Sequence, residues 1–297
     1  MPRAFKAVCA ALCLVSASGR AAAQPETSYL VTVRRGEVFS NQFCAVIELS
    51  RGSFRLRSEA FPDILLIPEA PVGEGASPGP GSYKLAFDRQ GKECIPVTGS
   101  PDGTSMLFYS QRGVDVRLTP QACLGDFPAV DGWYSPFHVG SNKLFAPVLR
   151  RVVGRFTDWR SAKGKGRKHA GTDLRGTYDE AVYPIAAGLV IALSFRSLTG
   201  TVVVKHRVGG GKPVYSKYIH LQDIPVKVGQ AVTHETRIGR LFGEAYLKKS
   251  RYKSNHLHLE IRKDYEDKGL MSSYGMNRKE LRRHCYDPLE FLRSRLD

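Results

Sequence analysis

For most of its length the chain consists of short runs in which apolar and polar residues alternate, separated by turns rich in Gly and Pro. Such alternation is typical of antiparallel strands with one buried face. In the first half it predicts strands at residues 29–34, 45–49, 53–57, 83–87, 106–110 and 114–118. We therefore expect residues 24–126 to form a β-rich N-terminal domain, in which the Pro- and Gly-rich segment 68–82 is a long mobile loop. No repeat or motif in this region indicates its role.

The second half continues the strand pattern and adds little helix. Strands are predicted at residues 189–193, 200–206, 214–221 and 256–262. Asp287-Pro288 predicts a short helix through Leu292, because Pro is favoured in the first turn of a helix. Residues 127–152 are expected to connect the two halves. Residues 153–297 are expected to form a mostly antiparallel β-sheet domain, with a cleft across one sheet.

The first 23 residues have the composition of a secretory signal peptide. Arg3 and Lys6 provide a positive start, residues 7–17 are apolar, and residues 21–23 form a small-residue cleavage site. The alternative is an uncleaved anchor, but the apolar stretch is shorter than the roughly 20 residues that span a bilayer. We expect an exported chain, periplasmic or secreted, with no transmembrane segment in its mature form.

Cysteine usage agrees with export. Beyond the signal peptide four cysteines remain, at Cys44, Cys94, Cys123 and Cys285. An even number in an exported chain predicts two disulfides, but the spacing leaves all three pairings open. If all four cysteines pair, at least one bridge links the N-terminal half to the C-terminal tail, because only Cys285 lies there.

The chain is strongly basic, with a formal charge of +16. The signal peptide carries three basic residues and no acidic one, so the mature charge is +13. Such a charge favours polyanionic partners, which include nucleic acid, anionic lipid surfaces and bacterial wall polymers. Export makes nucleic acid the least favoured of these. The chain also lacks the interleaved aromatic and basic residues of a single-strand binding groove.

Histidine and aspartate recur at spacings that suit a metal. His169 is followed four residues later by Asp173, and His256 and His258 are two apart in a strand, so they share one face of it. Between these motifs His220 lies in a Tyr-x-His-Leu strand. For each motif alone a bland alternative exists: a turn with a capping Asp, or an exposed polar strand face. Two His and one Asp would hold zinc, leaving the fourth position and a net +1 charge for an activated water.

In this order the motifs resemble those of the lysostaphin-type, or LytM-domain, zinc metallopeptidases of bacterial cell walls. The resemblance covers residues 153–292. It rests on the family's HxGxD, YxHL, VGQ and HLHFE motifs. These stand here as His169-Ala170-Gly171-Thr172-Asp173, Tyr218-Ile219-His220-Leu221, Val228-Gly229-Gln230 and His256-Leu257-His258-Leu259-Glu260.

The resemblance implies a role for each of these residues. His169, Asp173 and His258 would hold one Zn²⁺. His220 and His256 would flank the open position as general base and as partner of the tetrahedral oxyanion. Tyr218 is a weaker candidate for substrate contact, with packing in a strand as its alternative. The intact metal set argues against the metal-free LytM domains that only regulate other hydrolases.

The sequence departs from the family in the loop before the HLH motif, residues 243–255, which is bulkier and basic here. That loop lines the substrate groove in the family, so the departure puts the choice of peptide in doubt. Lys248 and Lys249 are weak candidates for contacts to the carboxylates of peptidoglycan stem peptides. The alternative is an ordinary solvated loop.

We therefore predict a zinc metalloendopeptidase that cuts peptide cross-links of peptidoglycan. The alternatives are a peptidase of the same fold acting on Gly-rich proteins or other cells' walls, and a non-catalytic, wall-binding regulator of other hydrolases. Expected partners are peptidoglycan and other anionic wall polymers. The N-terminal domain is expected to be either a wall-targeting module or an intramolecular cover of the cleft.

Overall fold

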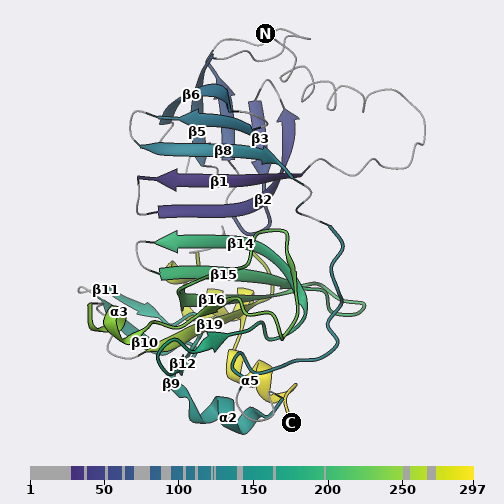
Figure 1. The fold of residues 1–297 in the computed structure, drawn as a ribbon, viewed down its shortest axis with the longest axis vertical. Coiled ribbons are helices and arrows are strands. Elements are labelled where there is room, and N and C mark those ends of the chain that lie inside the picture. The colour runs from purple at the N-terminus through teal and green to yellow at the C-terminus, as the bar shows by residue number, and fades with distance from the viewer. Residues whose placement is uncertain are drawn as a thin grey trace. The chain divides into compact units, whose positions relative to one another are not determined.

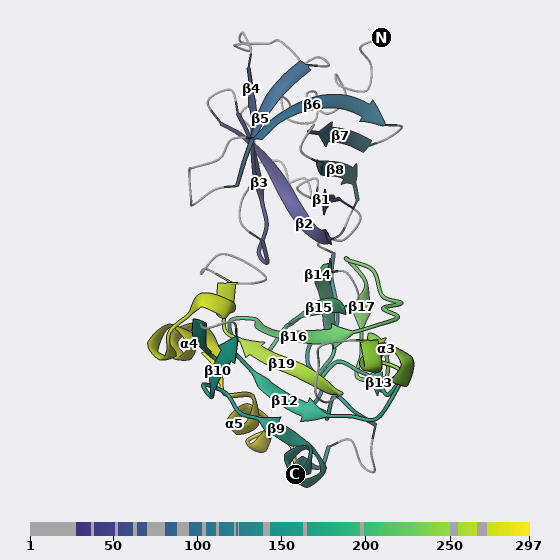
Figure 2. The ribbon, with the colours of Figure 1, turned by 90° about the vertical axis from the view of Figure 1, so that its left-hand side faces the viewer.

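The computed structural model describes two compact units of the chain. The described residues are 28–36, 39–50, 53–61, 64–69, 81–87, 95–102, 105–110, 113–121, 123, 125–138, 143–162, 165–196, 199–249, 255–265 and 272–297. The N-terminal unit comprises the described residues through Cys123 except 59–61, and the C-terminal unit comprises the remainder. Strand dominates both units (Figures 1 and 2).

The N-terminal unit is a closed ring of antiparallel strands. Its strands are β1 (Ser28–Arg35), β2 (Phe39–Ser50), β3 (Ser53–Arg57), β4 (Ile64–Pro68), β5 (Gly81–Phe87), β6 (Ile95–Asp102), β7 (Ser105–Tyr109) and β8 (Val114–Pro120). Each strand pairs with the next along the chain, and β1 pairs with both β2 and β8, which closes the ring. The simple alternation in the sequence therefore becomes a meander with the apolar face inside.

Side chains fill the interior of this ring. In β1 the alternate residues Tyr29, Val31 and Val33 are buried. Tyr83 and Phe108 meet edge to face, with ring centroids 5.4 Å apart. A Cβ on Gly99 would lie 3.0 Å from both rings, so a residue without a side chain gives this aromatic pair its room. Eight strands enclose a space that side chains can fill, which agrees with a packed core.

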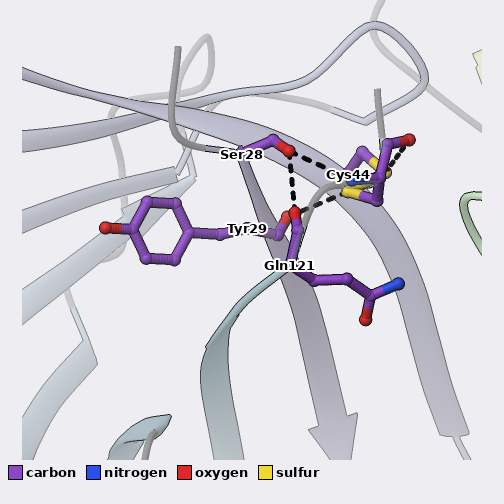
Figure 3. Close-up of a disulfide and its surroundings, with 5 residues drawn as sticks. Ser28, Tyr29, Cys44 and Gln121 are labelled. Carbon is purple, nitrogen blue, oxygen red and sulfur yellow. Dashed lines mark hydrogen bonds between the residues drawn. A yellow bond between two sulfur atoms is a disulfide. The ribbon is translucent and has the colours of Figure 1, made fainter. Parts of the chain in front are cut away.

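A disulfide joins β2 to the segment that follows β8. Cys44 and Cys123 are bonded, with Cα atoms 5.9 Å apart. The Ser28 hydroxyl donates to the Gln121 carbonyl at 2.7 Å and accepts from the backbone N–H of Cys123 at 3.1 Å (Figure 3). The disulfide and these hydrogen bonds stabilise the ring where β1 pairs with both β2 and β8 and so closes it.

The C-terminal unit is built on one antiparallel sheet with the order β14-β15-β16-β19-β12-β9 (Figure 1). Strands β17 and β20 pair with β14 and β19, and β10–β11 and β13–β18 form separate two-stranded sheets. The strands are β9 (Val152–Gly154), β10 (Trp159–Ala162), β11 (Lys165–Lys168), β12 (Thr172–Arg175), β13 (Ala181–Val182), β14 (Gly188–Arg196), β15 (Thr199–His206), β16 (Val214–Leu221), β17 (Ala231–Val232), β18 (Gly239–Arg240), β19 (His256–Arg262) and β20 (Cys285–Tyr286).

Short helices complete this unit. They are α2 (Phe145–Arg150), α3 (Glu244–Lys249), the 3₁₀ turn η2 (Ser272–Gly275), α4 (Arg278–His284) and α5 (Pro288–Arg293). Asp287 caps α5 by accepting from the backbone N–H of Leu289, and Pro288 follows it as the first helical residue. This is the one helix that the sequence predicted, and its Asp-Pro start is confirmed.

The described part of the expected connecting segment packs onto the C-terminal unit. The Trp133 ring meets that of Phe291 at a centroid distance of 4.7 Å. The backbone N–H of Tyr134 donates to the Ile185 carbonyl at 2.8 Å. The compact unit therefore begins about thirty residues before position 153, near Leu124.

The mostly β fold is confirmed, with a unit built on an antiparallel sheet at the C-terminus and a β-rich unit before it. The sequence pattern missed β4 and β6, which contain Pro68, Pro96 and Pro101, residues that are depleted in strands. The predicted signal peptide, Cys94 and most of the predicted loop 68–82 lie outside the described residues. Cys285 is buried in the C-terminal unit, and the second disulfide stays a prediction. No helix in the described ranges has both the length and the apolar character to cross a membrane.

We predict that Cys44→Ala lowers the free energy of unfolding of the N-terminal unit by about 2–4 kcal/mol, because the bridge closes a long loop in the unfolded chain. Hydrogen exchange of peptides from β1 and β8 would report the loss. Reducing agent should bring the parent protein to the variant's exchange rates and leave the variant unchanged. Equal rates in both proteins before reduction would contradict the prediction.

Candidate metal centre

Two adjacent strands present the metal-binding motifs to each other. Strands β12 and β19 pair antiparallel, with Asp173 directly opposite His258. His169 precedes β12 by three residues and is buried with them. The pairing of the two strands therefore brings the HxxxD and HxH motifs together, although His169 and His258 are 89 residues apart in sequence.

Three ligand atoms converge at this point. His169 Nε2 lies 3.0 Å from Asp173 Oδ1 and 2.9 Å from His258 Nδ1. His258 Nδ1 lies 2.9 Å from Asp173 Oδ1. In a tetrahedral zinc site, bonds of 2.0–2.2 Å place neighbouring ligand atoms about 3.3 Å apart. The triangle is thus a few tenths of an ångström smaller than zinc requires.

Hydrogen bonds on the far sides of the rings assign the lone pairs. His169 Nδ1 donates to the Arg155 carbonyl at 2.7 Å, so in a neutral ring its Nε2 carries a lone pair. His258 Nε2 lies 3.2 Å from Glu260 Oε1, which favours a proton there and leaves a lone pair on Nδ1. Two imidazole lone pairs and a carboxylate oxygen then face one another, and a cation between them relieves their repulsion.

The electrostatics also favour a cation. Burial raises the pKa of Asp173, but hydrogen bonds that His169 and His258 donate when a proton occupies the metal-facing nitrogen outweigh it and hold the pKa well below the usual range. For His258, burial lowers the pKa, and hydrogen bonds to Asp173 and Glu260 reverse this and raise it. The carboxylates thus stabilise positive charge on or beside His258. The described residues of this site fit the donor set of a zinc ion.

A tight turn before the HxxxD motif orients His169. The backbone N–H of Thr157 donates to the His169 carbonyl, and that of His169 donates to the Asp158 carbonyl, both at 2.8 Å. Thr157 has φ +64°, a left-handed conformation that costs a β-branched residue of order 1–3 kcal/mol. The turn places the Arg155 carbonyl against His169 Nδ1, which fixes the orientation of the ring.

Gly171 in the HxGxD motif has a steric reason. A Cβ at this position would collide with the backbone carbonyl of Leu259 and lie 3.0 Å from His258 Nε2. Any side chain here would push β19 and one ligand away from β12. The glycine therefore allows the two strands to approach closely enough to form the triangle.

His220 and His256 lie beside the triangle. Their ring centroids are 4.9 Å apart, and His220 is 6.3 Å from His258 by the same measure. His256 Nε2 lies 4.0 Å from Asp173 Oδ1. Burial, and then the neighbouring His256 and His258, hold the pKa of His220 well below its ordinary value. His220 is therefore neutral at neutral pH and can accept a proton.

His220 departs from regular strand geometry. Its φ is +72°, and the pairing of β15 with β16 shifts register here, with Gly200 opposite Leu221 and Thr201 opposite Ile219. One extra residue on β16 thus forms a β-bulge, a feature that re-aims side chains next to active sites. The sequence predicted simple alternation from Tyr218 to Leu221, so the bulge was not anticipated.

A buried charge network supports His258 from behind. Glu260 accepts from Lys217 Nζ at 3.1 Å and from the Ser273 hydroxyl at 3.0 Å to both of its oxygens. Arg262 Nη1 lies 3.8 Å from Glu260 Oε2. Lys217, Glu260 and Arg262 are all at most 2% exposed. Burial raises the pKa of Glu260, but Lys217 and then His258 outweigh it and lower the pKa, which keeps the carboxylate charged to hold the His258 ring.

The weaker site candidates lie elsewhere. Tyr218 is fully buried, and its hydroxyl accepts from the backbone N–H of Ile185 at 2.8 Å, which favours the packing alternative. Lys248 and Lys249 are exposed on α3, where Lys248 pairs with Glu244 at 2.9 Å. This placement agrees with the solvated alternative, and substrate contact by either lysine stays a prediction.

Several residues of the site were not assigned from the sequence. Arg160 had no role assigned from the sequence, and its Nη2 lies 2.6 Å from Asp173 Oδ2. The burial of Lys217 and the contact of Ser273 with Glu260 had no signal, because they come from pairing between distant segments. For Glu260 a signal existed, since it lies two residues after His258 on the same strand face.

Residues 167–270 match the model of the family described as Peptidase family M23. The matched segment contains all five residues of the cluster, His169, Asp173, His220, His256 and His258. None of the curated proteins matches the sequence.

Three solved structures illustrate the structural likenesses. A zinc containing peptidase from Vibrio cholerae shares 14% identity at a TM-score of 0.33, over 78% of this chain and 82% of its own. LytU shares 22% identity at a TM-score of 0.32, over 50% of this chain and 92% of its own. A chain of the SpoIIQ–SpoIIIAH pore forming complex shares 19% identity at a TM-score of 0.36, over 54% of this chain and 90% of its own. Likenesses this loose carry no inference.

We predict that Glu260→Gln destabilises the metal-free protein by about 3–5 kcal/mol, because it leaves the Lys217 ammonium buried without its main carboxylate partner. The double variant with Lys217→Met should regain most of this loss. Urea unfolding in the presence of a chelator would measure both. As a control, Glu244→Gln breaks an exposed pair and should cost less than about 1 kcal/mol. Equal stability of the single and double variants would contradict the prediction.

Proposed function

We propose that this protein, whose residues 167–270 form a domain of peptidase family M23, is a zinc-dependent endopeptidase that hydrolyses peptide cross-links of bacterial peptidoglycan. The observation that carries the proposal is the triangle of His169 Nε2, Asp173 Oδ1 and His258 Nδ1, whose atoms lie within 3.0 Å of one another. Three protein ligands with a fourth position left for water are typical of catalytic zinc sites.

His169, Asp173 and His258 would hold the zinc ion. When bound, the ion lowers the pKa of a water and polarises the carbonyl of the scissile peptide bond. With two neutral imidazoles and one carboxylate as ligands, the site keeps a net charge of +1. The residues that fix the ligands, the Arg155 carbonyl and Glu260, keep both imidazoles turned with a lone pair inward.

His220 would act as the general base. Its lowered pKa leaves the ring neutral, so it can take the proton of the attacking water and return it to the leaving amine. The β-bulge gives the ring a fixed direction on the rigid sheet. His256, partly exposed beside it, would donate a hydrogen bond to the oxyanion that forms on the carbonyl oxygen.

The composition of the chain supports a wall substrate outside the cytoplasm. The disulfide Cys44–Cys123 suits an oxidising compartment, which supports a periplasmic or secreted location. The net positive charge suits stem peptides with free carboxylates and other anionic wall polymers. Cleavage of Gly-rich proteins by the same site is a second candidate, and a digestion distinguishes it.

A regulator without catalysis is disfavoured by the cluster itself. Such a protein needs neither three converging ligand atoms nor a neutral, buried His220 beside them. The role of the N-terminal unit stays a prediction, either wall targeting or an intramolecular cover. Activity of the C-terminal unit far above that of the mature chain would support the cover, and equal activity would contradict it.

We predict that His169→Ala, Asp173→Ala and His258→Ala each lose zinc and activity, because each removes a ligand. In contrast, His220→Ala should retain zinc and lose about 10²–10⁴-fold in turnover, the usual contribution of a general base. Inductively coupled plasma mass spectrometry of the purified proteins gives the zinc content. Metal retained in all four variants would overturn the ligand assignment.

We predict that the mature chain digests purified peptidoglycan sacculi and that a zinc chelator abolishes the digestion. Mass spectrometry of the fragments should show loss of cross-linked dimers and identify the bond that is cut. A chelator-sensitive digestion of Gly-rich peptides with intact sacculi would favour the second candidate. If the zinc-loaded mature chain and the zinc-loaded C-terminal unit both leave sacculi and Gly-rich peptides uncut, both candidates are contradicted.

A further inference from the structure

We propose that Arg160 is a positioning residue that divides the two oxygens of Asp173, engaging Oδ2 and leaving Oδ1 alone to bind the metal. The inference rests on the proposed function, since it concerns the ion of that site. Arg160 lies in β10, outside the segment that matches the M23 family model. It extends the metal site to a hairpin that precedes the ligand motifs.

The geometry of the carboxylate carries this inference. Arg160 Nη2 lies 2.6 Å from Asp173 Oδ2, whereas Oδ1 lies 3.0 Å and 2.9 Å from the ligand nitrogens of His169 and His258. One oxygen thus faces the guanidinium and the other faces the metal position. A charge-assisted hydrogen bond of this length is among the stronger polar contacts in proteins. It holds the plane of the carboxylate as well as its distance.

The chain makes room for this contact at Gly154. Strand β9 pairs with β12 so that Gly154 lies opposite Asp173. A Cβ on Gly154 would collide with the Arg160 guanidinium and lie 2.7 Å from Asp173 Oδ2. Because both close groups are side-chain ends, an alanine here would displace Arg160 and press on the Asp173 carboxylate rather than break the sheet. The missing side chain at position 154 therefore serves the Arg160–Asp173 pair.

Arg160, in the strand that follows the turn orienting His169, also lies close to that ring. Its Nη2 lies 3.3 Å from His169 Nδ1, the atom that donates to the Arg155 carbonyl. The β10–β11 hairpin and the turn before it thus contact two of the three ligands. With Arg160 removed, Asp173 Oδ2 becomes available as an additional ligand, and the carboxylate loses the contact that sets its plane. We expect a looser site with a less open fourth position.

The test compares metal binding by the full mature chain and its Arg160 variants. Arg160→Ala should weaken zinc binding by about 10–100-fold, the usual effect of losing a group that orients a ligand. Zinc affinity is measured by competition with a chromophoric chelator on apo protein. With cobalt loaded in place of zinc, the parent should show the strong visible absorption of a four-coordinate ion. Arg160→Ala should show the weaker absorption of a cobalt ion with more ligands. Neither readout requires turnover.

Matched variants isolate the role. Arg160→Lys should recover part of the affinity, because one ammonium can still engage Asp173 Oδ2. Arg155→Ala removes one positive charge from the same turn, where only the backbone of Arg155 bonds to the site, and should bind zinc as the parent does. Gly154→Ala should reproduce the Arg160→Ala spectrum. The double variant with both Gly154→Ala and Arg160→Ala should bind zinc no more weakly than Arg160→Ala alone, because both changes remove the same contact.

Parental affinity and an unchanged cobalt spectrum in Arg160→Ala would overturn the inference and leave the proposed function intact. An equal loss in Arg155→Ala would also overturn it, because a general charge effect would then explain the result. A parent protein that binds no zinc would overturn the proposed function itself. Circular dichroism of the apo variants identifies any variant that fails to fold, and Gly154→Ala and Arg160→Lys then provide the comparison.

Discussion

Three atoms that each carry a lone pair are held within 3.0 Å of one another, and much of the C-terminal unit is arranged to keep them there. Without a cation, the three side chains stay together only where a proton lies between them or where other groups hold them in place. Each is therefore fixed from behind by a separate contact: the Arg155 carbonyl on His169, Arg160 on Asp173 and Glu260 on His258. A cation takes the place of the protons between these atoms, and the contacts that already hold the three side chains together favour its binding.

These supports explain features that would otherwise be costly. Burial of Lys217, Glu260 and Arg262 would be unfavourable without mutual pairing, and the pairing keeps Glu260 charged behind His258. The positive φ of Thr157 and of His220 is tolerated for a similar reason, because the turn and the bulge place the proposed ligand His169 and the proposed base His220. The sheet holds the backbone rigid, and the residues with positive φ set the directions of the His169 and His220 side chains.

The sequence predicted the fold class and the composition of the cluster, because strand alternation and motif order are local properties. His256 and His258 share a strand face, which spacing alone establishes. The residues that hold the ligand side chains in place could not be predicted. Ser273 reaches Glu260, and Arg160 reaches Asp173, only because the fold brings these segments together. The bulge at His220 was missed because an inserted residue leaves no mark in an alternating pattern. Strands β4 and β6 were missed because their prolines, which are depleted in strands, made these segments look like loops in the sequence.

The separation of His169 and His258 by 89 residues has a consequence for when the metal arrives. An unfolded chain holds no part of the triangle except the loosely spaced His169 and Asp173, so its affinity for zinc is low. In the proposed site, zinc binds only after β12 and β19 have paired, and binding adds to the stability of the folded state by mass action. On the proposed export and zinc dependence, the chain would take its ion from the compartment in which it folds. The zinc supply there, rather than that of the cytoplasm, would then set the fraction of active molecules.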